Sequence, residues 1–317
     1  MEDVNLAIRI PSRCIFNLAS FDILNGYGGG YGVALDTNSY LTINFSNDKN
    51  HIFPEEYSNL ISYYISLFQR KIHKNDSFHI QLSFDSRIQS HSGFASNMMV
   101  ACAIIYALNQ MYHEPFSVDE CIDMIKEYYI EKEADPEFDS FICTANALYM
   151  IFLGGFCIVD KHKSLCARKK ISSKMRCFII KTNSKWKNIN KKDLLAKAIL
   201  EDKKFDFVRE EIISIQLPKI LEEENYQELA CYTQFIQNGG GQKIYRKYME
   251  SSLCNLDALI QLLESKKFIT GFNNGSNIFV FTDRVLDVEK ICKKFSLTYD
   301  VFMLSLIHIS EPTRRRG

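Results

Sequence analysis

The chain has 317 residues with 38 basic and 38 acidic side chains, so its overall charge does not favour a nucleic-acid partner. Apolar residues make up 46% of the chain, which is enough for a substantial core, and the length suggests one large domain or two of roughly 100 to 200 residues each. No apolar run approaches the ~18 residues of a membrane span, and the polar N-terminus is unlike a signal peptide. The ten cysteines contain no CxxC pair, which favours reduced thiols in a cytoplasmic protein over disulfides or a zinc site.

The N-terminal part of the chain is expected to form strands and a glycine-rich turn. Two strands are predicted at 5–10 and 14–18, on either side of a break at Pro11. Glycines between residues 26 and 32 predict a turn in which the backbone adopts positive φ or approaches another segment closely. Residues 32–45 are expected to form a hairpin-like pair of strands.

The central stretch combines a strand, a short loop and a buried helix. After a helix predicted over 54–74, alternating apolar residues predict a strand over 78–84 with one buried face. Small polar residues from Ser90 to Gly93 form a loop, and an apolar stripe at helical spacing begins after Ala95. Such an arrangement can hold a phosphate, because the first amides of a helix are unpaired and carry partial positive charge.

This loop is similar to the phosphate loop of the GHMP kinases, the superfamily of galactokinase, homoserine kinase and mevalonate kinase, whose pattern is close to P-x-x-x-G-L-G-S-S-A. Gly93 and Ser96 stand where that pattern has glycine and serine, whereas Ala95 replaces a glycine and Asn97 the second serine. The resemblance implies that the loop binds the triphosphate of ATP, with Ser96 also at the magnesium ion. The residues assigned to the phosphate site are Ser90, His91, Ser92, Gly93, Phe94, Ala95, Ser96 and Asn97.

A second similarity lies nearer the N-terminus. In galactokinase-like enzymes a P-x-R motif is followed, nine residues after the arginine, by an aspartate, and Arg13 and Asp22 have this spacing. The resemblance implies that Arg13 offsets charge on the transferring phosphoryl group and that Asp22, together with Asp36, orients the substrate. Phe21 departs from the small residues of the family, and its bulk is expected to narrow a sugar pocket.

The helix predicted over 144–153 departs from the family at its catalytic position. It is expected to stop at Gly154–Gly155, and the GHMP kinases carry a catalytic aspartate seven or eight residues before this pair. Here those positions hold Ala147 and Asn146. An amide has no useful basicity, so Asn146 is expected at most to orient a hydroxyl group by a hydrogen bond. Phosphoryl transfer would then rely on positioning and electrostatics.

Two further stretches bear on the helices and on the partners. Ser117–Glu120 has the pattern of a capping box and predicts the start of a helix. Residues 161–204 hold fifteen Lys or Arg against three acids, and we interpret them as a solvated segment between domains rather than an RNA- or membrane-binding surface. Residues 224–249 are expected to form one long helix.

A third resemblance lies at a small-residue turn that enters an apolar strand. The third GHMP motif is a glycine-rich turn in an equivalent place, and Gly271, Asn274 and Gly275 match its small-residue character. The resemblance implies that these residues approach the substrate from the C-terminal part of the chain. The helix and strand that follow would complete a ferredoxin-like layer.

The three motifs together imply an α+β, two-domain GHMP kinase-like fold with an N-terminal mixed sheet and helices and a C-terminal ferredoxin-like layer. We expect an N-terminal nucleotide-binding domain over 1–165 and a C-terminal domain over 166–303. Residues 304–317, LSLIHISEPTRRRG, look like translated sequencing-adapter read-through, in which case the natural C-terminus is missing.

Three functional hypotheses follow. The first is an ATP- and magnesium-dependent kinase that phosphorylates a hydroxyl of a small metabolite such as a sugar or sugar phosphate. The second is a synthase that uses phosphoribosyl pyrophosphate, because His91-Ser92-Gly93, the missing aspartate and the GGFxxxD run of 154–160 resemble the archaeal beta-ribofuranosylaminobenzene 5'-phosphate synthases. The third is a catalytically inactive binding protein, because glycines have been lost from the motifs.

Overall fold

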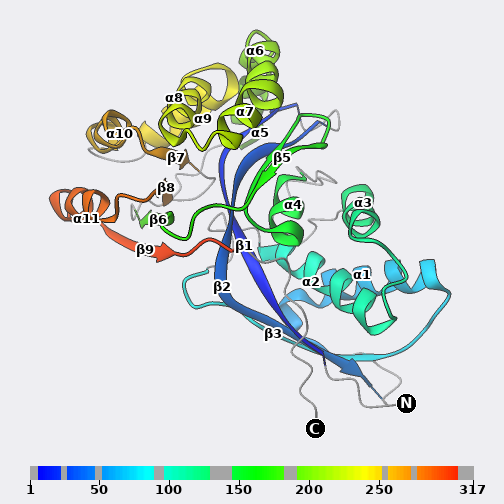
Figure 1. Cartoon of the computed structure of the whole chain (residues 1–317). Helices are drawn as coiled ribbons and strands as arrows, with labels where there is room; N and C mark the ends of the chain where they lie inside the picture. Colours follow the sequence, from blue (N-terminus) through cyan, green and yellow to red (C-terminus); the bar gives the residue numbers. More distant parts are fainter. Residues whose placement is uncertain are drawn as a thin grey trace.

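The chain forms two antiparallel sheets, each covered by helices (Figure 1). The structure is a computed structural model that describes residues 6–22, 27–46, 52–88, 96–128, 145–181, 191–251, 256–272 and 277–305. None of the helices in these ranges is long and apolar enough to span a membrane. The arrangement confirms the α+β class predicted from the sequence.

The N-terminal sheet has the strand order β1-β2-β4-β5, with β3 also paired to β2. Its strands are β1 (Leu6–Leu18), β2 (Gly30–Phe45), β3 (Phe78–Ser83), β4 (Phe156–Val159) and β5 (Leu165–Lys169). All pairs of these strands are antiparallel. A single parallel pairing is described at the sheet, the isolated bridge between Ile52 and His79. β1 and β2, with 13 and 16 residues, run side by side through much of the molecule (Figure 1).

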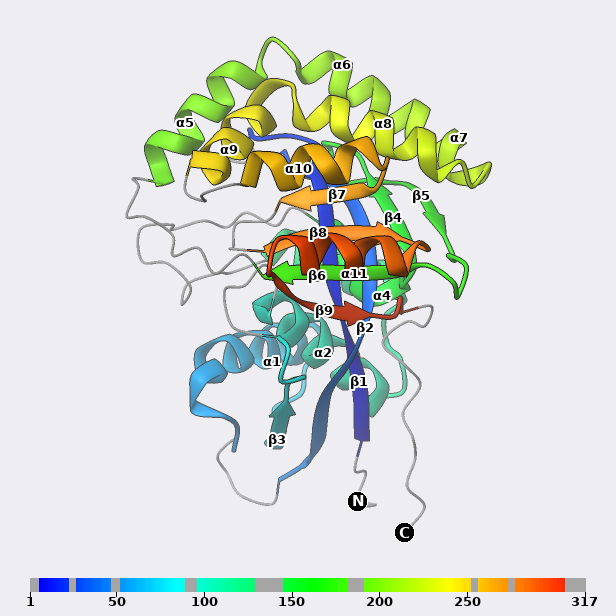
Figure 2. The same cartoon turned by 90° about the vertical axis from the view of Figure 1, so that its left-hand side faces the viewer.

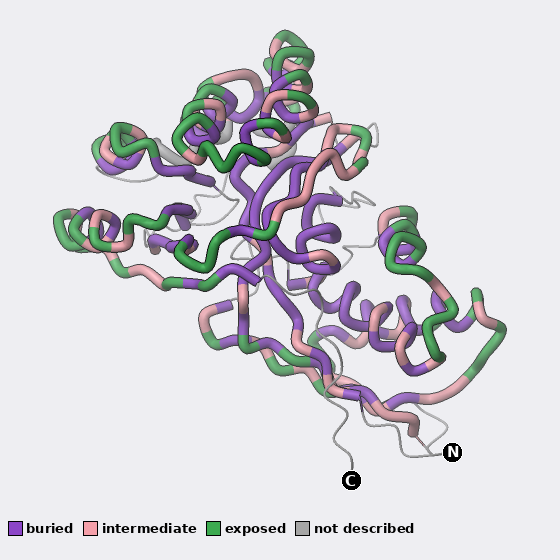
Figure 3. Tube along the Cα trace, viewed as in Figure 1, coloured by how far each residue is buried: buried purple, intermediate pink, exposed green. Residues whose placement is uncertain are grey.

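Four helices and a short 3-10 turn lie against this sheet. They are α1 (Ser58–Ile72), α2 (Ser96–Met111), α3 (Val118–Tyr128) and α4 (Asn146–Leu153), and the 3-10 turn is Glu55–Tyr57. α2 and α4 both contact β1 and β2, while α1 and α3 pack on the outer side of α2. α2 is therefore buried on nearly all sides, which explains why it is apolar almost throughout rather than amphipathic (Figure 3).

Two expectations for the N-terminal strands were wrong. β1 continues through Pro11 instead of breaking there, because the ladder with β2 has an irregularity between Ile10 and Ser12 where no Pro11 N–H is needed. The Thr37 hydroxyl donates to the Ile10 carbonyl at 2.7 Å and fills this gap. Residues 32–45 likewise belong to one strand, β2, and do not fold into a hairpin.

The C-terminal sheet has the order β7-β8-β6-β9, which is the order of a βαββαβ ferredoxin-like unit. Its strands are β6 (Arg176–Lys181), β7 (Ile269–Phe272), β8 (Asn277–Thr282) and β9 (Thr298–Phe302). The two crossover helices are α10 (Leu256–Ser265) and α11 (Val285–Lys294). This part of the chain therefore has the ferredoxin-like layer that the resemblance implies.

Both faces of this sheet are buried, and alternate residues of each strand serve different cores. Phe178 of β6 and Val280 of β8 pack with α10 and α11, whereas Ile179 and Phe281 join the large core of the N-terminal sheet. Phe16 of β1 lies against Phe281, with the ring centroids 5.8 Å apart. The two halves of the molecule are thus joined by one continuous apolar core.

A group of short helices is inserted between β6 and α10. They are α5 (Lys191–Asp202), α6 (Asp206–Glu211), a π-helical turn (Ile212–Gln216), α7 (Leu217–Glu222), α8 (Tyr226–Gln237) and α9 (Gly240–Ser251). Figure 2 shows them as a layer on the β7 side of the C-terminal sheet. The single helix expected over 224–249 is two helices, α8 and α9, because the chain turns at Asn238–Gly239.

We retain the two expected domains as a proposal, and the strand pairing shifts the boundary between them. A boundary at residue 165 falls inside β5, which pairs with β4 of the N-terminal sheet, so we propose a boundary between Lys169 and Arg176. The basic stretch 161–204 contains β5, β6 and α5, so only part of it connects the two halves. Of the proposed non-native tail, Leu304 and Ser305 pair with β2, where the Ser305 amide donates to the Ala34 carbonyl at 2.9 Å.

Candidate active site

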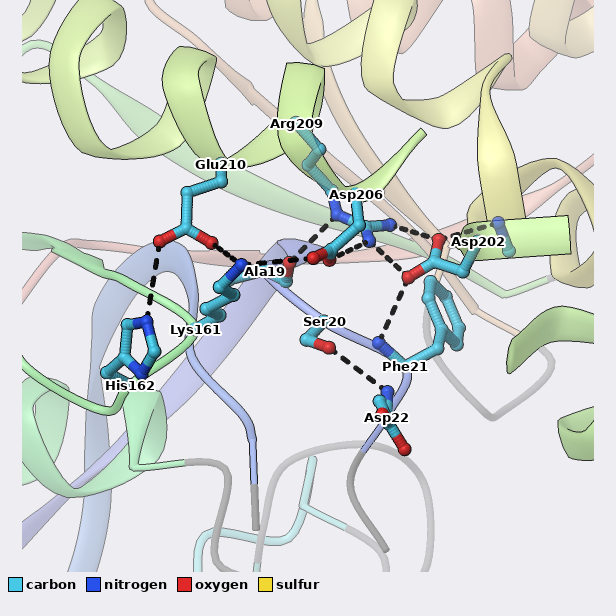
Figure 4. A network of polar contacts seen from close by, with 11 residues as sticks. Ala19, Ser20, Phe21, Asp22, Lys161, His162, Asp202, Asp206, Arg209 and Glu210 are labelled. Carbon is cyan, nitrogen blue, oxygen red and sulfur yellow. Dashed lines mark hydrogen bonds and ion pairs between the residues drawn. The ribbon is translucent and has the colours of Figure 1, made fainter. Parts of the chain in front are cut away.

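Asp22 lies just beyond the end of β1, in a segment that we call the acceptor segment, Ala19–Asp22. The Ala19 amide donates to the Gly29 carbonyl at 3.3 Å, and the Asp22 amide donates to the Ser20 hydroxyl at 3.1 Å. The acceptor segment therefore lies beside the residues that lead into β2. In Figure 4 the carboxylate of Asp22 points away from the charged residues around it.

The turn that enters β2 requires a glycine at position 29. Gly29 has φ +81°, and a Cβ atom there would lie 1.9 Å from the Asp160 carbonyl oxygen of the β4–β5 turn. The Gly28 amide donates to the neighbouring Lys161 carbonyl at 2.8 Å. The sequence-based expectation of positive φ and close backbone approach in this turn is confirmed.

Asn146, the residue at the family's catalytic position, lies against this turn. It is the first residue of α4 and is fully buried, and its Nδ2 donates to the Gly29 carbonyl at 3.1 Å. The preceding Ala145 has left-handed backbone angles, with φ 62°. The Asn146 side chain thus stabilises the glycine turn beside the acceptor segment by donating a hydrogen bond. An ionised carboxylate at this position could not donate it.

Arg13 and Asp36 lie farther along the strands, away from Asp22. Arg13 is half-buried on β1 opposite Ala34 of β2. The carboxylate of Asp36 forms an ion pair with Arg9 at 2.7 Å. Asp36 is six residues beyond Gly30, which corresponds to roughly 20 Å along an extended strand. The structure therefore does not bring Asp36 and Asp22 together.

The predicted phosphate loop is described only at its C-terminal end. Residues 90–95, from Ser90 to Ala95, lie outside the described residues, whereas Ser96 and Asn97 form the start of α2, with Ser96 buried. The first turn of α2 contains no acidic residue, so no carboxylate there opposes a phosphate at the helix N-terminus.

Before the loop, Asp85 and Arg87 form a two-point pair. Arg87 Nε donates to Asp85 Oδ1 at 2.9 Å and Nη2 to Oδ2 at 2.6 Å. Arg87 Nη1 also reaches the Val301 carbonyl of β9 at 3.0 Å. The hydrogen bond from Arg87 holds the pKa of the Asp85 carboxyl well below its usual range, against the effect of burial. The chain that leads into the loop is thereby attached to the C-terminal sheet.

The third motif is also described only in part. Gly271 lies in β7, where a Cβ atom would be 2.5 Å from the Ile15 carbonyl oxygen of β1, so glycine there permits the close packing of the two strands. Asn274 and Gly275 lie outside the described residues.

A magnesium ion would find few protein ligands in the described part of the chain, where no group of three or more His, Cys, Asp or Glu side chains could hold a metal ion. In proteins, magnesium is commonly bound through one or two protein groups together with phosphate oxygens and water. The Ser96 hydroxyl, at the start of a helix without acidic neighbours, has suitable chemistry for such a site.

The expectation for Phe21 was wrong. Its side chain is 2% exposed and packs with Ala198 of α5, with Leu18, Ile199 and Ile244 around it. The ring thus points into the helical layer instead of narrowing a pocket, because the layer offers it an apolar environment.

Sequence reasoning missed a charged network around the acceptor segment (Figure 4). We call Arg209, Asp202 and Asp206 the clamp. Arg209 of α6 is fully buried, and its Nη1 donates to Asp202 Oδ1 at 2.5 Å while its Nη2 pairs with Asp202 Oδ2. The run Gly239–Gly241, which lies against the clamp, is the one signal in the sequence that could have indicated it.

Comparisons with known proteins agree with the motifs. A family model described as GHMP kinases N terminal domain matches residues 59–144. A homoserine kinase from Cytophaga hutchinsonii has a similar structure, with 14% identity and a TM-score of 0.65 over 98% of this chain and 96% of that chain. A search of curated protein sequences found no match.

Two other solved structures are similar over almost their whole length. The Methanococcus jannaschii mevalonate kinase has 14% identity and a TM-score of 0.63, covering 95% of this chain and 98% of that chain. A mevalonate diphosphate decarboxylase from Staphylococcus aureus has 10% identity and a TM-score of 0.67, covering 98% of each chain. Residues 59–144 thus match the N-terminal domain of the GHMP kinases, and the chain as a whole has the fold of these solved structures.

Proposed function

We propose that this chain is a magnesium- and ATP-dependent kinase that transfers a phosphoryl group to a hydroxyl of a small metabolite, of the sugar or sugar phosphate type. The observation that carries the proposal is the start of α2, where Ser96 opens a helix with no acidic residue in its first turn, directly after the predicted phosphate loop. Structures with this fold include kinases of homoserine and mevalonate, and a phosphotransferase related to CoA biosynthesis. One similar decarboxylase is described in complex with AMPPCP and magnesium.

In this proposal each residue has a separate task. Bound ATP would supply the phosphoryl group, and the magnesium ion would offset part of the negative charge of the phosphates. The loop Ser90–Asn97 holds the triphosphate, Arg13 stabilises the charge of the transferring group, and Asp22 orients the acceptor hydroxyl. Asn146 keeps the glycine turn in place, so the acceleration comes from positioning and electrostatics without a carboxylate base at that position. Gly271, Asn274 and Gly275 approach the acceptor from the C-terminal half, whereas Asp36, which is paired with Arg9 away from Asp22, has no task in this proposal.

A second candidate function is favoured by one observation. Asn146 donates its amide to a backbone carbonyl, so the described site has no carboxylate at the family's catalytic position. An enzyme that uses phosphoribosyl pyrophosphate, of the beta-ribofuranosylaminobenzene 5'-phosphate synthase type, does not need a base there to activate an acceptor hydroxyl. A binding protein without catalytic activity remains the third candidate.

Calorimetric titration of the full chain with magnesium-ATP, and separately with phosphoribosyl pyrophosphate, distinguishes the three. We expect magnesium-ATP to bind and Gly93→Val to abolish binding with an unchanged melting temperature, because the valine side chain would fill the space that a phosphate needs next to the backbone. Ala196→Val adds bulk on the exposed side of α5 and is the control that should bind normally. Preferential binding of phosphoribosyl pyrophosphate would support the synthase, and binding of neither would leave the inactive protein.

A further inference from the structure

The clamp holds the acceptor segment by its backbone. Arg209 Nε donates to the Ala19 carbonyl at 2.8 Å, and the Phe21 amide donates to Asp202 Oδ2 at 3.4 Å. One Arg–Asp pair therefore bonds the backbone on both sides of Ser20. Since Asp22 follows directly and its own amide is bonded to the Ser20 hydroxyl, the path of the chain up to Asp22 is defined by these contacts.

The same clamp reaches the other side of the turn through Lys161. Asp206 accepts from Arg209 Nη2 at 3.2 Å and from Lys161 Nζ at 3.1 Å. Lys161 is also paired with Glu210 at 2.6 Å, and its backbone carbonyl accepts the Gly28 amide. Hydrogen bonding to Glu210 raises the pKa of Lys161, so the lysine stays charged at neutral pH. α6 thus contacts the chain directly before the turn that joins β1 to β2, and Lys161 links it to the chain after the turn (Figure 4).

Three successive glycines at the start of α9 lie in close contact with Asp202 of the clamp and with the aromatic rings beside it. A Cβ atom would lie 2.4 Å from the Phe205 ring at Gly239, 2.7 Å from Asp202 Oδ1 at Gly240, and 2.7 Å from the Phe21 ring at Gly241. The Gly241 amide donates to Asp202 Oδ1 at 2.8 Å. Gly240 also has φ +49°, a conformation that residues with a side chain rarely adopt, so the close contacts and the backbone angle together explain the glycines.

Stability alone does not explain such an arrangement. Burying an Arg–Asp pair carries a desolvation penalty that often exceeds the attraction between the charges, and apolar residues of similar volume are commonly as stable. Apolar residues, however, could not bond the Ala19 carbonyl and the Phe21 amide. What the charged pair provides, and an apolar core would not, is a defined backbone conformation in the acceptor segment.

We propose that Arg209, together with Asp202 and Asp206, is a positioning unit that fixes the acceptor segment so that Asp22 is presented to the acceptor hydroxyl. The role of Asp22 rests on the proposed function, whereas the fixing of the segment does not. The clamp makes no contact with the predicted phosphate loop among the described residues. Its loss should therefore release the acceptor segment without weakening the binding of magnesium-ATP.

Hydrogen–deuterium exchange with mass spectrometry tests this on the full chain. In Arg209→Met, peptides that contain Phe21 and Asp22 should exchange at least tenfold faster than in the wild type, because the Ala19 carbonyl loses its donor and Asp202, which accepts from the Phe21 amide, loses the guanidinium group that orients it. Exchange in peptides from α2 should change only by the amount that the lower global stability accounts for, and calorimetry should give the same dissociation constant for magnesium-ATP. Asp206→Ala, at a partly exposed side chain, should give a smaller increase and serves if Arg209→Met does not fold.

Arg246→Met is the matched control. Arg246 also lies in the helical layer and pairs with a carboxylate, Glu264, at 2.5 Å, but this pair joins α9 to α10. Its removal should leave exchange at Phe21 and Asp22 as in the wild type. Unchanged exchange in folded Arg209→Met and Asp206→Ala, or an equal increase in Arg246→Met, would overturn the proposal. Failure of the wild type to bind magnesium-ATP would instead overturn the proposed kinase function. The exchange comparison would still show whether the clamp fixes the backbone of the acceptor segment.

Discussion

Two Arg–Asp pairs connect the two halves of the molecule, and they do so in opposite directions. Arg209, in the helical layer, pairs with Asp202 and donates to the Ala19 carbonyl at the end of β1. Arg87, in the N-terminal half, pairs with Asp85 and donates to the Val301 carbonyl of β9. Each guanidinium group thus binds one carboxylate at two points and one backbone carbonyl of the other half.

The two pairs differ in burial. The side chains of Arg209 and Asp202 are 0% and 5% exposed, whereas Arg87 is 34% exposed over a buried Asp85. Water and salt screen a pair that solvent reaches, so removing its arginine leaves a carboxylate that can be partly hydrated. Removing the arginine of a fully buried pair leaves an uncompensated charge. The comparison teaches that similar pairing geometry does not imply a similar effect on stability.

The largest effect is expected from Arg209→Met. It should lower the free energy of unfolding by about 3–5 kcal/mol, because Asp202 would remain buried without its cationic partner. Urea unfolding followed by circular dichroism measures this change. The double variant Arg209→Met/Asp202→Leu removes both charges and should recover much of the loss, and a double variant as unstable as the single one would contradict the explanation.

Arg87→Met should have a smaller effect, about 1–2 kcal/mol in the same urea experiment. Asp85 keeps the hydrogen bonds from the backbone amides of Asn38 and Arg87, both at 3.0 Å, and removal of the partly exposed Arg87 side chain would let water reach it. The loss comes from the Val301 contact and from the packing of the guanidinium group over the Phe302 ring at 4.1 Å. A loss equal to that of Arg209→Met would show that burial does not distinguish the two pairs.

The smallest effect is a dependence on pH at the Asp85 pair. The pKa of Asp85 is lowered in the folded protein, mainly by the hydrogen bond from Arg87, so its stabilising contribution is complete above the unfolded pKa of about 4 and decreases as the pH falls through the folded value. The stability difference between the wild type and Asp85→Asn should therefore be constant from pH 7 to 5 and smaller by about 1 kcal/mol at pH 3. A difference independent of pH over this range would mean that the charge of Asp85 does not contribute.

Local patterns were sufficient for several elements. The capping box at Ser117 is confirmed, since the Ser117 amide donates to Glu120 at 2.7 Å and the Glu120 amide to the Ser117 hydroxyl at 3.3 Å. Gly154 ends α4 as expected, and the strand and helix on either side of the predicted phosphate loop lie where alternation and helical spacing predict them. These features depend on residues within a few positions of each other, so one sequence contains the information.

The errors arose where distant segments meet. Pro11 is tolerated within β1 because β2 has an irregular register opposite it, and Phe21 is buried because α5 and α9 lie beside it. Neither partner can be identified from the residues around Pro11 or Phe21. The clamp is the clearest case, since Ala19 and Arg209 are 190 positions apart in the sequence.

The sequence by itself therefore determined the local elements, the α+β class and the three motifs with their order along the chain, because these rest on short-range periodicity and on residue types. Only the tertiary structure decided that Asp22 and Asp36 lie apart, that Asn146 supports the glycine turn, and that Arg209 holds the acceptor segment. Those facts depend on which chain segments pack together, and packing between segments far apart in sequence leaves little local pattern for a single chain to reveal.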